Sequence, residues 1–252
     1  MAHGMTDRVL DRLLRGAIER AAAPNGVRFT ERQLYFELCR GVVPAHRLPR
    51  RPAFIVPAFV PDLLFRAALD RYGTIPGLLE SARPLPRGVG RNTTEPDLFD
   101  YGLPRLLVCE SIQVATMLRA NGVPMESACP VVSADDLPLD PGIAAMLDRA
   151  GGATVYVLHD ASEEGLGLPA RLPTLTDIPD GVRVAAIGLI PSQAAPLHLP
   201  HALGRAVEVE SVNPAVLLRT VHRLVRGIHR TTTPLVDVRS ARRTGFLTWP
   251  TA

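Results

Sequence analysis

Two acidic residues each follow a short apolar segment and could together bind a metal ion. Glu110 ends the segment LLVCE at 106–110, and Asp160 ends VYVLHD at 155–160. Mg²⁺ prefers oxygen ligands and needs only one or two carboxylates beside water. A metal held by these acids would stabilise negative charge on a phosphate ester. The alternative is that each acid only interacts with the N-terminus of the helix that follows it, where negative charge is favoured.

The elements around these acids alternate between strand and helix. The segments SIQVATMLRANG and DPGIAAMLDRAGG read as helices that end at Asn or Gly. Such alternation predicts a parallel sheet with helices on its faces, and ligands collect at the carboxyl ends of its strands. If the first and third strands are neighbours, Glu110 and Asp160 converge. The four expected strands lie in residues 105–110, 128–133, 154–160 and 182–190.

The N-terminal region reads as helical. Apolar residues recur at helical spacing in 6–23, and APNG at 23–26 breaks the pattern. A second helix over 30–41 is predicted by Thr30 as cap and Gln33 three residues later. Helix, tight break and helix favour a helix-turn-helix or winged-helix unit. Two packed helices in any helical lobe are the alternative.

Proline and glycine mark the divisions of the chain. The proline-rich stretch 42–61 allows only short strands or a wing, and a helix is expected over 61–72. Prolines and glycines are also frequent in 81–104. We therefore expect a winged-helix-like region at 1–80, a linker at 81–104, and an α/β domain at 105–252.

The α/β domain is expected to include a basic amphipathic helix at 213–230. One face of this helix is apolar, and arginines recur along another at spacings of four, three and four. These arginines are candidates for contact with nucleic acid, and the alternative is an ordinary solvated helix face. The four residues are Arg219, Arg223, Arg226 and Arg230.

Composition excludes several classes of protein. All 28 basic residues are arginine and the formal net charge is +3, which permits nucleic-acid binding without arguing for it. The three cysteines fit no disulfide or zinc spacing. No apolar run approaches the roughly 18 residues of a membrane span, and the N-terminus has no signal core. These features predict a cytoplasmic protein without a membrane partner.

In order and motif, the chain resembles the Toprim domain, and in particular the A subunit of topoisomerase VI and the related meiotic double-strand-break protein. LLVCE matches the family's glutamate after the first strand. VYVLHDASEEG matches its later acidic motif through Asp160 and Gly165, and AAIGLIPS at 185–192 is similar to the stretch that follows. TERQLYF at 30–36 is similar to the motif around the family's nucleophilic tyrosine.

This resemblance implies a Toprim-like parallel sheet flanked by helices, preceded by a winged helix. It implies Mg²⁺ held by Glu110 and Asp160, with Glu164 and Ser162 completing the shell. It also implies that Arg32 and Tyr35 act on a DNA phosphate, that the chain forms a homodimer, and that a partner protein supplies an ATPase. Two positions depart from the family: Ser162 stands at its second aspartate, and Phe36 at its usual nucleophile.

The resulting expectation is a Mg²⁺-dependent, DNA-associated protein in the manner of a topoisomerase VI A subunit, with phosphodiester transesterification as the reaction of an active form. Because Ser162 and Phe36 alter the motif, a catalytically inactive scaffold or interaction protein is one alternative. A small-molecule α/β enzyme with its pocket at the same strand ends is another. His159 and Cys109 are interpreted as packed core residues.

Overall fold

The structure, a computed structural model, describes residues 2–24, 26–80 and 101–227. Its centre is a four-stranded parallel sheet in the order β3-β2-β4-β5. The four strands expected from the sequence are therefore confirmed, as is the α/β class. β2 and β4 are neighbours, which was the condition for Glu110 and Asp160 to converge. The strands are β2 (Arg105–Cys109), β3 (Val131–Ser133), β4 (Thr154–Leu158) and β5 (Arg183–Gly188).

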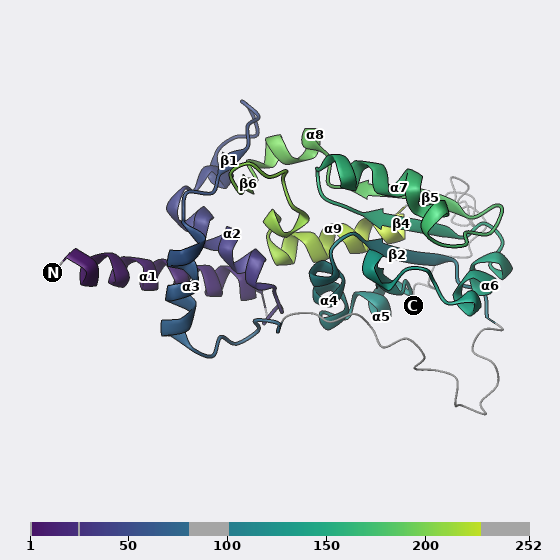
Figure 1. The fold of residues 1–252 in the computed structure, drawn as a ribbon, viewed down its shortest axis with the longest axis horizontal. Coiled ribbons are helices and arrows are strands. Elements are labelled where there is room, and N and C mark those ends of the chain that lie inside the picture. Colours follow the sequence, from purple (N-terminus) through teal and green to yellow (C-terminus); the bar gives the residue numbers. More distant parts are fainter. Residues whose placement is uncertain (1, 25, 81–100, 228–252) are drawn as a thin grey trace, which may run out of the picture.

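Both faces of the sheet are buried because helices cover each of them (Figure 1). Leu107 and Tyr156 point to the face covered by α4, α5 and α9. Leu106 and Val155, their neighbours along the strands, point to the face covered by α6 and α7. The covering helices are α4 (Ile112–Ala120), α5 (Val123–Ser127), α6 (Pro141–Arg149), α7 (Glu163–Leu175) and α9 (Pro214–Gly227).

The N-terminal helices surround an apolar core of their own. α1 (Ala2–Ala22), α2 (Glu31–Val42) and α3 (Asp62–Tyr72) bury aromatic and aliphatic side chains between 10 and 75. The expected capping box is present: Gln33 N donates to Thr30 Oγ1 and Thr30 N donates to Gln33 Oε1. The three helices expected in this region are confirmed.

The proline-rich stretch contains one short strand, β1 (Val56–Pro57), which pairs in parallel with β6 (Pro200–His201). Residues 200–201, from the second half of the chain, thus form a two-stranded sheet with a strand of the N-terminal half. A wing, a Toprim-type sheet and the division at 81–104 stay predictions. The shorter elements are the 3₁₀ turns at Ala45–Arg47, Ala134–Asp136, Ala195–Leu197 and Val209–Ser211, and α8 (Pro191–Ala194).

α7 forms against the local preference of its residues. Its residues include Gly165, Gly167, Pro169 and Pro173, all of which disfavour helix formation. The helix forms because Leu168 and Leu172 are buried against the sheet, so tertiary packing outweighs local preference. Residues 81–100 of the expected linker and 228–230 of the expected C-terminal helix lie outside the described residues. None of the helices described is long and apolar enough to cross a membrane.

A buried ionic network joins α2 to the segment before α9. Glu37 is 1% exposed, and its carboxylate accepts from Arg40 Nη1 at 2.5 Å and from Asn213 Nδ2 at 2.9 Å. Arg20 Nε lies 3.6 Å from the same carboxylate. Arg40 also donates to the carbonyl of Ser211. The contacts that join the two halves are therefore buried hydrogen bonds of the charged Glu37 and Arg40 to the neutral amide of Asn213 and the carbonyl of Ser211.

Removing the Glu37 carboxylate should strongly destabilise the fold. Glu37→Ala leaves Arg40 buried without its counter-ion, and breaking a buried pair in this way costs about 3–5 kcal/mol. Asp62→Ala is the control, because its pair with Arg66 at 2.9 Å is largely exposed and is expected to contribute less than about 1 kcal/mol. Urea denaturation measures both free energies of unfolding. Equal losses in the two variants would show that the buried network does not join the halves.

Candidate functional site

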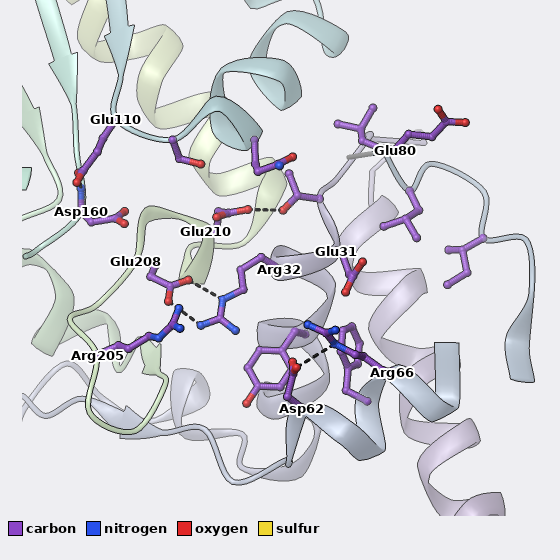
Figure 2. A pocket seen from close by; sticks show the side chains of 18 of the residues that line it. Glu31, Arg32, Asp62, Arg66, Glu80, Glu110, Asp160, Arg205, Glu208 and Glu210 are labelled. Carbon is purple, nitrogen blue, oxygen red and sulfur yellow. Dashed lines mark hydrogen bonds and ion pairs between the residues drawn. The ribbon is translucent and has the colours of Figure 1, made fainter. Parts of the chain in front are cut away.

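A cleft of about 1000 Å³ separates the N-terminal helices from the carboxyl edge of the sheet (Figure 2). Three arginines line it: Arg32, Arg66 and Arg205. The acidic side chains are far more numerous, so the cleft has a pronounced negative charge. They are Glu31, Asp62, Glu80, Glu110, Asp160, Glu164, Glu208 and Glu210.

Glu110 and Asp160 meet at one edge of this cleft. Glu110 directly follows β2 and Asp160 follows β4, with Cys109 paired in register to Leu158. The backbone N–H of Asp160 donates to Glu110 Oε2 at 2.7 Å. Figure 2 shows the Glu110 side chain reaching toward Asp160, whose own carboxylate points into the cleft. The two residues therefore lie next to each other at the edge of the cleft, and the meeting of their carboxylates at a metal ion stays a prediction.

The carboxylate of Asp160 is held in a setting that disfavours its charge. Asp160 Oδ1 accepts from the backbone N–H of Val209 at 2.6 Å, which favours the ionised form. Burial acts more strongly in the opposite direction, and the negative charges of Glu110 and Glu208 add to it. Together they raise the pKa of Asp160 to about 6.

The first turn of α7 fits closely around the two acids. Ser162 caps this helix, because its hydroxyl accepts from the N–H of Gly165 at 2.9 Å. A side chain at Gly165 would place its Cβ 2.6 Å from Glu110 Oε2 and 2.5 Å from the carbonyl oxygen of Asp160. Glycine at this position therefore lets the helix approach the Glu110 carboxylate. Glu164 is exposed on the same turn and lines the cleft.

Two further acids of the cleft were missed in the sequence. Glu208 receives two hydrogen bonds from Arg32, from Nε and Nη2, each at 2.6 Å. Glu210 accepts from Thr30 Oγ1 at 2.7 Å. Burial raises the pKa of Glu210 to about 7 against the lowering effect of Thr30, and Glu208 and Asp160 add to the rise. The strict alternation of apolar and acidic residues in VEVE at 207–210 was the available signal.

Tyr35 lies at the cleft as a packed residue. It is 6% exposed, and its hydroxyl donates to the carbonyl of Val60 at 2.8 Å. Burial is the main cause that raises its pKa to about 12. The Arg32 guanidinium lies 5.1 Å from the ring centre of Tyr35 and 4.8 Å from that of Phe36. Arg32 is thus occupied by Glu208 and two aromatic rings, and a less ionisable phenol is a weaker nucleophile.

Glu110 and Asp160 suit a metal that needs few protein ligands. Each carboxylate has one oxygen fixed by a backbone N–H, which orients the group and leaves its second oxygen for a ligand. No three His, Cys, Asp or Glu side chains within the described ranges are grouped closely enough to enclose a metal. Two carboxylates with water are sufficient for Mg²⁺, whereas zinc sites use three or four protein ligands.

The predicted arginine row lies outside the cleft residues, on α9. Arg219, Arg223 and Arg226 are exposed there, while Leu217, Val221 and Val225 face the core. Arg230 lies beyond the described residues. The other core interpretations hold, because Cys109 and His159 are both buried.

Substitution of Gly165 should disturb the two acids. In Gly165→Ala the new Cβ must displace either Glu110 or the α7 backbone, and overpacking of this kind costs about 1–3 kcal/mol. Gly167→Ala on the same helix is the control, since its nearest contact would be Arg171 Nε at an ordinary 3.7 Å. Higher helix propensity should raise its stability by up to about 1 kcal/mol. Thermal and urea unfolding measure the difference, and the opposite order of stability would contradict this packing.

Comparison of the chain with protein-family models, with curated proteins and with solved structures finds no match.

Proposed function

We propose that the protein binds DNA and that a divalent cation held by Glu110 and Asp160 assists this binding. Its function would then be related to that of the topoisomerase VI A subunits, which its sequence resembles. The observation that carries this proposal is the hydrogen bond of the Asp160 N–H to Glu110 Oε2 at the ends of adjacent parallel strands. Mg²⁺ is the cation whose ligand preference these two carboxylates meet. Glu164 and the Ser162 hydroxyl lie on the adjoining turn of α7.

The charge of the cleft supports a role for the cation. Eight carboxylates against three arginines would repel a DNA phosphate that approaches the strand ends. The pKa values of Asp160 and Glu210 are raised, in part by neighbouring carboxylates, and a bound cation would relieve this repulsion. When bound, Mg²⁺ supplies positive charge to a phosphate oxygen. A pocket for an apolar small molecule would instead be lined mainly by apolar side chains.

Binding is proposed here in place of strand cleavage. Phe36 has no oxygen with which to attack phosphorus. Tyr35 donates its hydroxyl hydrogen to the carbonyl of Val60, and burial raises its pKa to about 12, so formation of a phenolate is disfavoured. Arg32, the other residue implied by the motif, is paired with Glu208. We therefore assign Arg32 and Tyr35 to the packing of α2 against the cleft.

The exposed arginines of α9 are proposed to contact the DNA backbone. Arg219, Arg223 and Arg226 stand on the solvent face of a helix whose opposite face is fixed in the core. Arginine pairs well with phosphate because its planar fork offers two parallel donors.

A homodimer and a partner that supplies an ATPase, both implied by the resemblance, belong to the same proposal.

A divalent cation should stabilise the fold through Glu110 and Asp160. At ten times its Kd, a ligand that binds only the folded state raises the free energy of unfolding by about 1.4 kcal/mol. The increase should be larger at pH 8 than at pH 5, because Asp160 with its pKa of about 6 holds a proton at the lower pH. Thermal unfolding with and without Mn²⁺ measures the effect.

Glu110→Gln and Asp160→Asn should each remove most of this stabilisation. Glu163→Gln is the matched control, because Glu163 is an exposed acid on the same turn that does not line the cleft. An equal Mn²⁺ effect in all three variants, or none in the unaltered protein, would show that these strand-end acids do not hold the cation.

Arg219→Glu combined with Arg223→Glu should weaken binding to a DNA duplex at least tenfold. Two lost phosphate contacts should also reduce the slope of log K against log salt by about 2. Stability should change little, since both side chains are exposed. Fluorescence anisotropy across a salt series at fixed Mg²⁺ measures both quantities. The control is Arg8→Glu with Arg15→Glu on α1, which changes the net charge by the same amount. Equal losses of DNA affinity in the two double variants would show that the arginines of α9 form an ordinary solvated helix face.

A further inference from the structure

A second cavity, of about 170 Å³, lies at the other end of α2 from the acidic cleft. It is enclosed by α1, the C-terminal end of α2 and the 3₁₀ turn Ala45–Arg47. Among the residues that the structure describes, no acidic side chain lines it. The charged and titratable residues of this described lining are Arg12, Arg20, Arg40, His46 and Arg47.

Two of these arginines are held in fixed positions. Arg40 is 7% exposed, with Nη1 bound to Glu37 and Nη2 to the carbonyl of Ser211. Arg20 Nη2 donates to the carbonyl of Glu37 at 3.0 Å. The Arg20 guanidinium fits between two glycines, since a Cβ at Gly41 would lie 2.9 Å from Nη2 and a Cβ at Gly16 would lie 3.2 Å from Nη1. The cavity is therefore a preformed one.

The positive charge at this cavity exceeds what the protein itself neutralises. The single negative charge of Glu37 neutralises only one of the two positive charges of Arg20 and Arg40. The C-terminus of α2 contributes only about half a negative charge. Arg12 and Arg47 are exposed at the rim, and neither side chain has a hydrogen-bond or ion-pair partner among the described side chains of residues 7–24, 26–80 and 101–227. Positive charge gathered in a concave site attracts an anion.

We propose that this cavity binds a phosphate group. Its charged groups come from three directions, α1, α2 and the 3₁₀ turn, which suits a tetrahedral anion better than a planar carboxylate that one arginine fork can satisfy. A water molecule occupies about 30 Å³ of liquid, so the cavity has room for one such anion. The phosphate is either a terminal monoester or an internal diester of a nucleic-acid strand that passes the rim.

This inference goes beyond the proposed cation and DNA functions and does not depend on either. The cavity and the acidic cleft share α2 but no lining residue. Free inorganic phosphate is a sufficient probe, so the site can be tested without any DNA binding at the cleft or at α9.

His46 offers a direct reporter of an anion in the cavity. Burial lowers the pKa of His46, and the nearby positive charges of Arg40, Arg47 and Arg20 lower it further, against an opposing effect of Glu37. A bound dianion favours the imidazolium form, so phosphate should raise this pKa. The pKa is measured by NMR titration of His46 with and without inorganic phosphate, at constant ionic strength maintained with chloride.

Arg12→Gln combined with Arg47→Gln should reduce the phosphate-induced rise of the His46 pKa and weaken phosphate binding at least tenfold. Arg15→Gln with Arg50→Gln is the matched control, since both arginines are exposed and neither lines the cavity. A His46 titration that phosphate leaves unchanged, or an equal response in both double variants, would overturn the proposal.

The source of the phosphate is then resolved with a short oligonucleotide that carries or lacks a 5′-phosphate. Tighter binding of the phosphorylated form, lost in Arg12→Gln/Arg47→Gln, identifies a terminal monoester. Equal binding of both forms, again lost in that variant, identifies an internal diester. If the cavity variant and the control variant bind both oligonucleotides alike, no nucleic-acid phosphate enters the cavity, and the proposal fails for this source.

Discussion

Seven residues, 207–213, connect the two halves of the protein, and the geometry of the cleft depends on them. Toward the sheet, Val209 N donates to Asp160 Oδ1 and Ala161 N donates to the carbonyl of Val207. Toward α2, this segment is bound through four side chains or carbonyls. The pairs are Glu208 with Arg32, Glu210 with Thr30, the Ser211 carbonyl with Arg40, and Asn213 with Glu37. Any shift of α2 relative to the sheet must break several buried polar contacts together, which is costly.

The same segment explains why the cleft contains poorly neutralised acids. Glu208 and Glu210 are used to hold α2, but their charges also face Asp160. Raised pKa values of Asp160 and Glu210 mean that the folded protein binds more protons than the unfolded chain between roughly pH 4 and pH 7. In the absence of a cation these two groups therefore contribute stability at low pH that is lost as the pH rises through about 6 to 7. A cation in the cleft would oppose this loss at neutral pH.

Much of the sheet could be predicted from the sequence, because each strand has an apolar run of the right length and the helices that became α4 and α6 have clear end signals at Asn121 and Gly151. Glu110 and Asp160 followed from the same pattern, since parallel strand ends meet at one edge. α7 could not be predicted from local preference, because burial of Leu168 and Leu172 overrides its glycines and prolines. The alternation in VEVE could have placed Glu208 and Glu210 on one side of the chain, but their partners Thr30 and Arg32 lie about 180 positions away, and no local pattern identifies them.

The placement of charge along α2 connects the two proposed ligands. A helix has a partial positive charge at its N-terminus and a partial negative charge at its C-terminus, each about half a unit. Glu210 lies at the N-terminus beside Thr30, and Arg20 and Arg40 lie toward the C-terminus, so both arrangements agree with the helix dipole. In each case, however, the charge gathered is several times larger than the dipole can offset. The excess of acids at one end and of arginines at the other is the common basis of the two proposals, a cation at the sheet edge and a phosphate about 15 Å away along the helix.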